Sequence, residues 1–294
     1  MKRHIAFALI LFFCTINPTL AMDWKVLHER SDALTFKNAQ VQVEKSPSSK
    51  EALYCLGLVC LNLHKDAQAR DNFNKILAIN PESIEAKWGI AEVMRRQHKT
   101  AESQKMLEEI IKQDPNFSPA LNSLAFIKYR QLQLDQAVRL ALRVIEQGRQ
   151  GSDTSNYVRA LLIYGGTKGM IAHYGGPFSK IVNGTAALPN IKKAQSIQPD
   201  AAGVYFGLGS FYFLAPAIVG GDIDLAKEYL EKAIAKEPLF ADSYVRLAQV
   251  YKQKGDKAKF KEYLNKALEI DPGNELALDV KSGACKFICA GNQE

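Results

Sequence analysis

Prolines recur along the chain at nearly constant spacing, and this spacing limits the possible folds more than any other feature. Six of the eleven prolines stand at positions 47, 81, 115, 199, 238 and 272, so the successive intervals are 34, 34, 84, 39 and 34 residues. Each proline follows a stretch with helical periodicity and precedes polar residues, as expected where proline ends a helix. A period of about 34 residues predicts an array of stacked helical hairpins.

Other columns of residues repeat in phase with the prolines. Small residues recur in the first helix of each expected hairpin, and a second small column recurs in the second helix. Small side chains allow two helices to approach closely, while larger ones fill the space between neighbouring hairpins. The first column comprises Gly57, Ala91, Ala125, Gly209 and Ala248, and the second comprises Ala69, Ser103, Ala137 and Ala226.

These columns resemble tetratricopeptide repeats over most of residues 32–272. The resemblance implies an all-α fold, a right-handed superhelical solenoid of roughly six stacked hairpins, and a non-enzymatic scaffold that binds a protein or peptide in its concave groove. Four positions depart from the pattern. Lys87 and Lys128 replace apolar or aromatic residues, Phe260 occupies a small column, and Arg149 stands where a proline is expected.

Residues 1–21 are predicted to form a signal peptide, because two basic residues precede an apolar run over 5–14 and small residues follow up to Ala21. The mature protein then begins at Met22 and resides in the periplasm or outside the cell. The apolar run is about half the length that spans a bilayer, so an uncleaved anchor and stable membrane insertion are less favoured.

The rest of the chain is divided by the repeat pattern. We expect a capping helix at the end, because a terminal repeat must cover its last apolar face. The predicted units are an amino-terminal half repeat over 22–49, three repeats over 50–151, an extended atypical repeat over 152–199, two repeats over 200–274, the first with a five-residue insertion, and a capping helix and tail over 275–294.

Charge gives little indication of a nucleic-acid partner. Without Lys2 and Arg3 the chain has 36 basic and 31 acidic residues, a formal charge of +5, and no run of five like charges. The resemblance to tetratricopeptide repeats implies instead a protein or peptide partner, of unknown identity. The sequence leaves the oligomeric state open, including a homo-oligomer.

The glycine-rich stretch that ends in Gly220, Gly221 and Asp222 suggests a phosphate-binding loop, but the preceding strand and the lysine of such loops are missing. Alignment with Gly255 and Asp256 in the next repeat predicts a hairpin turn instead. There, glycine supplies a positive φ and aspartate caps the second helix. The alternative is a ligand or insertion site at Pro216, Gly220, Gly221 and Asp222.

Residues 186–238 also resemble the T-component of tripartite TRAP transporter systems, in which an apolar-aromatic helix is followed by proline and Gly-Gly-Asp. That resemblance implies an alternative function as an accessory protein of solute transport. It would use the insertion from Pro216 to Asp222 and the glycine-rich segment 164–184. The residue pattern of 164–176 favours a closely packed helix with a glycine-rich exit over a ligand site. Pro189 is then expected to open the second helix of the extended repeat.

Histidines and cysteines form no recognisable catalytic or metal-binding motif, and no cofactor is predicted. His64 and His98 occupy the same turn of successive repeats, where we expect solvated side chains. Cys285 and Cys289 could form a disulfide in an irregular tail, whereas Cys55 and Cys60 are expected to be buried thiols.

The concave groove is the predicted functional surface. Residues of the first helices that lie outside the packing columns should face it, and aromatic residues beside arginines are typical of peptide-binding hot spots. Trp88 is equally compatible with the core, since a small rotation of its helix would turn it inward. The predicted groove residues are Tyr54, Leu58, Trp88, Glu92, Arg95, Arg96, Asn122, Phe126, Tyr129 and Arg130.

Overall fold

A computed structural model describes residues 22–284, 286 and 287, and all regular structure in this part of the chain is helical. The amino-terminal helices are α1 (Trp24–Asp32), α2 (Phe36–Lys45), α3 (Lys50–Asn62), α4 (Asp66–Ile79), α5 (Ile84–Arg96), α6 (Thr100–Gln113), α7 (Ser118–Arg130) and α8 (Leu134–Gly151). They are followed by α9 (Thr154–Tyr174), α10 (Pro177–Ile197), α11 (Ala202–Leu214), the 3-10 turn η1 (Ala217–Val219), α12 (Ile223–Lys236), α13 (Ala241–Gln253), α14 (Lys257–Ile270) and α15 (Glu275–Ser282).

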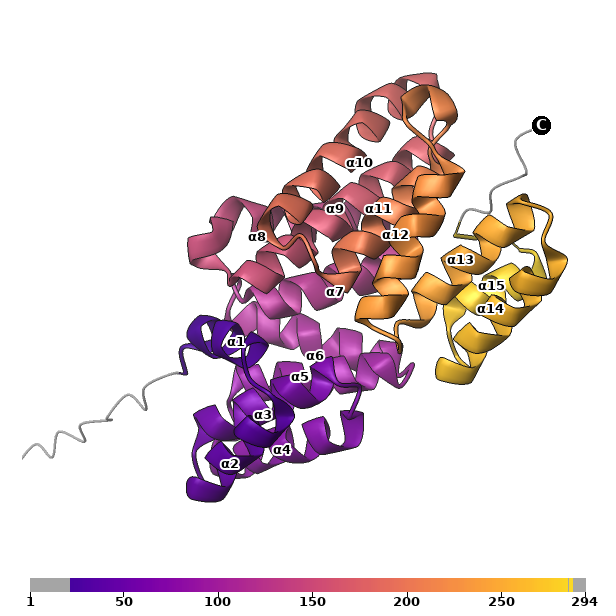
Figure 1. The fold of residues 1–294 in the computed structure, drawn as a ribbon. Helices are drawn as coiled ribbons and strands as arrows, with labels where there is room; N and C mark the ends of the chain where they lie inside the picture. The colour runs from indigo at the N-terminus through magenta and orange to yellow at the C-terminus, as the bar shows by residue number, and fades with distance from the viewer. Residues whose placement is uncertain (1–21, 285, 288–294) are drawn as a thin grey trace, which may run out of the picture.

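Consecutive helices from α3 to α14 form antiparallel hairpins that stack side by side (Figure 1). The first helices of the hairpins, α3, α5, α7, α9, α11 and α13, also contact one another in order along the stack. We call the surface that they turn toward the superhelix axis the inner surface. The predicted all-α repeat solenoid is confirmed.

The small columns lie at the closest contacts within the hairpins. A Cβ atom added to Gly57 would lie 2.5 Å from the Phe73 ring, and one added to Gly209 would lie 2.7 Å from Leu230. Ala69 and Ala125 are fully buried at equivalent points. Larger residues would push the paired helices apart, which explains why the repeat keeps these positions small.

Residues 164–176, which suggested a ligand site, form the end of α9 and its exit. A Cβ atom on Gly165 would lie 2.9 Å from the Ala187 carbonyl oxygen, so this glycine allows α9 and α10 to pack closely. Both helices have 21 residues, against 13 in α7. The extra length of this repeat therefore lengthens a hairpin and forms no separate loop.

Pro189 was expected to open the second helix of this repeat, and that expectation is wrong. The helix begins at Pro177, and Pro189 lies inside α10. Pro177 suits the first helical position because its missing N–H has no intrahelical partner there. Pro189 is exposed, so the carbonyl that loses its helical hydrogen bond to the proline can be hydrated.

The Gly-Gly-Asp stretch is a hairpin turn, as predicted. Gly220 has a φ of 98°, and the Asp222 carboxylate accepts hydrogen bonds from the backbone N–H groups of Asp224 and Leu225 at the start of α12. Gly221 has a different role. A Cβ atom there would lie only 1.8 Å from the Ala215 carbonyl oxygen. The predicted left-handed glycine thus stands one position earlier than expected.

The superhelix brings its first two hairpins into contact with its last two. His64 and His98 end the turns after α3 and α5, with φ angles of 55° and 60°. The His64 ring nitrogen Nε2 lies 2.9 Å from a Glu237 oxygen, and that of His98 lies 2.8 Å from an Asp271 oxygen. Each pair joins residues 173 positions apart. These histidines were expected only to be solvated, and the structure instead places both at contacts across one turn of the superhelix.

Helix α1 lies on the inner surface rather than at the end of the stack. It packs on α3 and reaches α9. At the other end, α15 covers the last repeat, where Leu276, Ala277 and Val280 join the apolar cluster of α13 and α14.

Candidate functional site: the inner surface

The predicted groove residues lie on the inner helices α3, α5 and α7, but the structure divides them into two groups. Half of them are only partly covered, namely Arg95, Arg96, Phe126, Tyr129 and Arg130. The others are buried, namely Tyr54, Leu58, Trp88, Glu92 and Asn122. The expectation that the whole set is exposed in the groove is therefore wrong for the second group.

An aromatic cluster under α1 covers two of the buried residues, Tyr54 and Trp88. The His28 ring of α1 lies 5.7 Å from the Tyr54 ring and 5.4 Å from the Trp88 ring. Trp24 packs edge to face on Phe117 at 5.1 Å. Of the two orientations that the sequence allowed for Trp88, the structure has the buried one, with 5% of the residue exposed. The chain's own first helix thus fills the amino-terminal part of the inner surface.

Buried polar groups fix α1 to α3 and α9. His28 Nε2 lies 2.8 Å from the Tyr54 hydroxyl, and its Nδ1 lies 3.1 Å from the Asn156 side-chain nitrogen and 3.4 Å from an Asp153 oxygen. Burial lowers the pKa of His28, although Asp153 acts in the opposite direction. The ring therefore favours the neutral form, which suits a side chain enclosed by aromatic residues.

A second polar cluster surrounds Glu92 on α5. The Arg95 guanidinium donates to both carboxylate oxygens, at 2.6 Å to one and 3.1 Å to the other, and the Ser123 hydroxyl donates at 2.9 Å. Burial alone would raise the pKa of Glu92, but Arg95 and Arg159 outweigh it and lower the pKa, so the carboxylate stays ionised. Trp88 joins the same cluster, because its indole N–H donates to Ser123 Oγ at 3.1 Å.

Arg159 of α9 is the least constrained arginine of this cluster. Its guanidinium lies 3.6 Å from Glu92, beyond direct hydrogen-bond distance, and a third of its side chain is exposed. Arg96, by contrast, donates to the Leu61 carbonyl at 2.8 Å and to Asp66 at 3.2 Å. Sequence reasoning missed Arg159, because α9 belongs to the atypical repeat whose register the spacing did not define.

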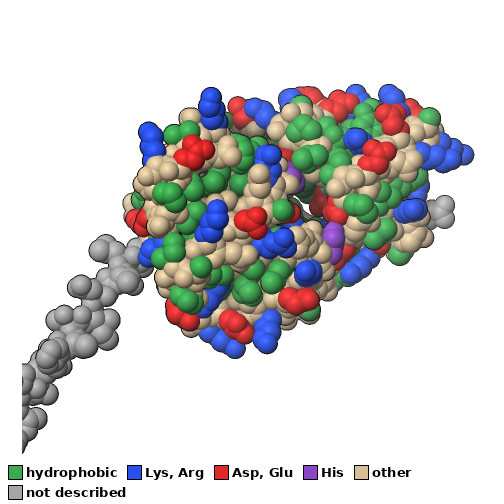
Figure 2. All heavy atoms as spheres, turned by 90° about the horizontal axis from the view of Figure 1, so that it is seen from below, with side chains coloured by type: hydrophobic (Ala, Val, Ile, Leu, Met, Phe, Trp, Pro, Cys, Tyr) green, Lys and Arg blue, Asp and Glu red, His purple; other side chains and the backbone are tan. Residues whose placement is uncertain are grey.

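These groups line a cavity of about 200 Å³ in the inner surface. One face of the molecule is also hollowed near its centre, with histidine and acidic side chains around the hollow (Figure 2), whereas His28, the histidine that lines the cavity, is buried. The cavity has room for about one side chain of a partner and offers both charged and apolar contacts. Its lining comprises His28, Ser31, Asp32, Leu58, Leu61, Asn62, Trp88, Glu92, Arg96, Ser155, Asn156 and Arg159.

The carboxyl-terminal part of the inner surface is covered by residues 286 and 287, which we call the tail segment. The Arg130 guanidinium lies over the Phe287 ring at 4.5 Å, and only 3% of Phe287 is exposed. Arg130 also donates to Glu275 at 3.2 Å. Arg130, which was predicted to face the groove, thus already contacts an aromatic residue of the same chain.

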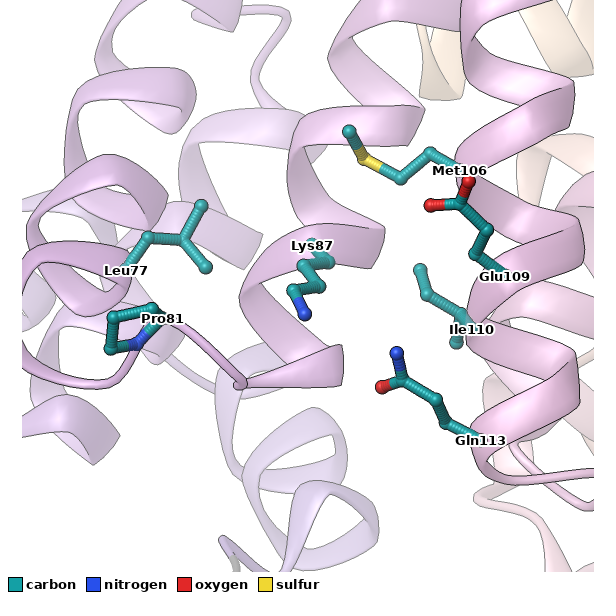
Figure 3. Close-up of a pocket in the computed structure, with 7 residues that line it drawn as sticks. All are labelled: Leu77, Pro81, Lys87, Met106, Glu109, Ile110 and Gln113. Carbon is teal, nitrogen blue, oxygen red and sulfur yellow. The ribbon is translucent and has the colours of Figure 1, made fainter.

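A groove of about 280 Å³ lies on another part of the molecule, between the α4–α5 loop and α6 (Figure 3). Lys87 extends into it, beside Leu77, Pro81 and Gln113. Because lysine replaces the apolar residue that the repeat pattern expects, this junction is not fully packed. The Lys87 ammonium pairs with Glu82 at 2.8 Å, so the groove offers no obvious chemistry.

The remaining candidate sites gain no support as ligand sites. Pro216 and Gly220 lie in an exposed turn, and the Asp222 carboxylate serves as a helix cap. Within the described residues, no group of three or more potential ligands could hold a metal ion, and no helix is both long and apolar enough to cross a membrane.

Two cysteines lie among the described residues, and both match their expectation. Cys55 and Cys60 are free and buried, as predicted, and burial raises the pKa of Cys60 to about 11, so its thiol is a poor nucleophile at neutral pH. Cys285 and Cys289 lie outside the described residues, as does the predicted signal peptide.

Comparisons with known proteins give a consistent family assignment. Models of the tetratricopeptide repeat match residues 67–125 and 241–274. A search of curated protein sequences gave no match.

Solved structures of several repeat proteins are similar in fold. One is TTC0263, a thermophilic tetratricopeptide repeat protein of Thermus thermophilus, with a TM-score of 0.55 and 18% identity over 68% of this chain and 97% of that one. A tetratricopeptide repeat protein of Parabacteroides merdae has a TM-score of 0.52 and 14% identity over 88% and 97% of the two chains. A chain of the APC/C hetero-tetramer Cut9-Hcn1 has a TM-score of 0.57 and 16% identity. The match covers 88% of this chain and 47% of that one. At these identities the likeness shows the fold alone.

Proposed function

Because this chain belongs to the tetratricopeptide repeat family, we propose that it is a non-enzymatic scaffold of the cell envelope that holds a segment of a partner protein against its inner surface. The repeat fold is consistent with protein–protein interaction. The proposed location depends on the predicted signal peptide.

The observation that carries this proposal is the partly exposed group at the centre of the inner surface. Arg95 lies over the Phe126 ring at 5.0 Å, and Arg159 borders the cavity beside them. An aromatic ring offers contact area at low entropic cost, and a guanidinium can bind a carboxylate through two hydrogen bonds. We therefore expect a partner to place an acidic or polar side chain in the cavity.

The proposal can be tested by photo-crosslinking in cells. A photoreactive phenylalanine analogue at Phe126 should crosslink one protein, identified by mass spectrometry. The same analogue at Leu142, which is exposed on α8, should not crosslink it. Equal crosslinking from both positions, or none from Phe126, would contradict binding at the inner surface.

A charge-matched pair of variants tests the role of the cavity. Arg159→Ala should weaken the Phe126 crosslink about tenfold, because the variant lacks the guanidinium that would bind the partner's side chain. Arg95 remains hydrogen-bonded to Glu92 in this variant. Arg139→Ala removes the same charge from an exposed position on α8 and should leave the crosslink unchanged. If the two variants behave alike, Arg159 does not contact the partner.

The transport alternative predicts a different readout. The insertion exposes Ile218, at 94%, and Val219, at 58%, which suits a protein contact better than an enclosed solute site. Native mass spectrometry of the purified protein should detect a bound small molecule or a closed ring of subunits if this alternative holds. An empty monomer would count against it.

A further inference from the structure

The tail segment returns to the inner surface through a sharp reversal after α15. Gly283 ends that helix with a φ of 73°, a left-handed conformation that favours glycine. The chain then runs back past α15, and Phe287 joins the apolar cluster that contains Met170 and Tyr244. Residues far apart in the sequence, on α7, α9, α13 and α15, contact these two residues.

Most hydrogen bonds to the tail segment involve its backbone rather than its side chains. The Asp279 carboxylate accepts the N–H of Lys286 at 2.8 Å and the N–H of Phe287 at 2.9 Å, one on each oxygen. Arg246 donates to the Phe287 carbonyl at 3.1 Å, and the Tyr174 hydroxyl donates to the Lys286 carbonyl. Two N–H groups and two carbonyls of adjacent residues are thus all paired with side chains.

Of the two residues of the tail segment, Phe287 is the one whose side chain this site encloses. Arg130 covers one face of the ring, and Arg130 is itself held by Glu275 and by Asp242 at 3.7 Å. Asp279 and Arg246 are 8% and 4% exposed, so their hydrogen bonds to the backbone are largely shielded from water. Buried, charge-assisted hydrogen bonds are stronger than neutral ones at the surface.

We propose that this is a binding site for an aromatic residue within an extended segment of a partner protein, and that the tail segment occupies it in the free chain. The inference rests on the proposed scaffold function and adds what the scaffold recognises in its partner. The recognised segment has one aromatic ring and a backbone with two free N–H and two free carbonyl groups. A partner segment with an aromatic ring and free backbone groups at these positions can make the same contacts.

Competition is feasible because the tail segment is small and lies outside the repeats. It consists of two residues that follow the capping helix, so its release requires no rearrangement of the hairpins. Its release breaks the contacts of two residues only, so it costs less free energy than unfolding a repeat. While the tail segment occupies the site, a partner cannot bind there. The apparent affinity for the partner therefore falls in proportion to the fraction of molecules in which the site is open. The partner must therefore displace Phe287 before its own ring can bind under Arg130.

The test uses the full chain and a synthetic peptide of residues 284–294 that carries Cys285→Ser and Cys289→Ser and a fluorescent label. Phe287→Ala empties the ring site in the protein. By fluorescence anisotropy, this variant should bind the peptide at least about tenfold more tightly than the wild-type chain, whose own tail competes. A peptide with Phe287→Ala should bind neither protein.

Phe178→Ala is the matched control, because it removes a phenylalanine that is 81% exposed on α10. This variant should bind the peptide as weakly as wild type. Adding Asp279→Asn to the Phe287→Ala protein should reduce binding again by about tenfold, since one carboxylate oxygen that accepts a backbone N–H is replaced. Circular dichroism of each variant verifies that the helices are retained.

Equal binding by wild type and Phe287→Ala, or no binding by the Phe287→Ala protein, would overturn the inference. Either result leaves the proposed function standing if the Phe126 crosslink still depends on Arg159. If the peptide binds as expected but the Phe126 crosslink does not depend on Arg159, the result contradicts the central cavity as a partner site. The tail site would still stand.

Discussion

The two ends of the inner surface are covered by segments of the same chain, but in different ways. At the amino-terminal end, α1 places the Trp24 ring and the buried His28 ring against Tyr54, Trp88 and Phe117. At the carboxyl-terminal end, the tail segment places one phenylalanine under Arg130 and satisfies its backbone with Asp279, Arg246 and Tyr174.

The difference shows how a repeat protein can treat two parts of one groove differently. The α1 contact buries a large apolar area and a connected polar network, so α1 is part of the folded core. The tail contact is small and involves two residues outside the repeats, so it can open without loss of the fold. Only the second cover leaves a site that a partner can compete for.

The largest expected effect is at the α1 contact. Trp88→Ala removes a buried ring and its hydrogen bond to Ser123, so we expect the free energy of unfolding to fall by about 3–5 kcal/mol. Urea denaturation followed by circular dichroism measures this change. Phe178→Ala, at an exposed position, should change it by less than about 0.5 kcal/mol. Similar losses in both variants would show that α1 does not make Trp88 part of the core.

The second effect is a pH dependence at the α1 contact. Burial lowers the pKa of His28, so below about pH 6.5 the unfolded chain binds a proton that the folded chain does not. The free energy of unfolding should therefore decrease as the pH falls below this value, by at most about 1.4 kcal/mol per pH unit from this one group.

The control for this effect is His28→Gln, which keeps an amide for hydrogen bonding but cannot titrate. Denaturation of both proteins between pH 7 and pH 5 should give a smaller slope for the variant, even though the variant is less stable overall. An identical slope in the two proteins would mean that His28 takes up its proton equally in the folded and unfolded states.

The smallest effect concerns the wild-type chain and compares the two covers directly. Limited trypsin digestion should cut after Lys286 at least about tenfold faster than after Arg30 in α1, because the tail segment opens locally while α1 opens with the core. Mass spectrometry of timed samples gives both rates. Cleavage after Arg30 first would reverse the order of stability that we assign to the two covers.

The repeat architecture could be predicted in detail because its determinants are local or periodic. Gly57 and Ala125 mark the closest contacts, and the turn at Asp222 follows from its alignment with Asp256. The atypical repeat was harder. Pro189 looked like a helix start, yet the helix begins at Pro177, because the register of a lengthened hairpin is set by packing between α9 and α10.

The functional surface was predicted only in part. The arginines of the groove were placed correctly on the inner helices, but nothing in the repeat pattern indicates that α1 buries Trp88 or that Phe287 lies under Arg130. The pairs of His64 with Glu237 and His98 with Asp271 were missed for the same reason, since residues 173 apart share no local signal.

By itself the sequence determined the helical hairpins, their small packing columns and the turn chemistry, since these depend on contacts within one repeat or between neighbours. Only the tertiary structure decided which parts of the inner surface are accessible. The reason is geometric. Each hairpin is rotated slightly relative to the one before it, and the total rotation over the stack brings distant segments together. No single residue position determines that total rotation.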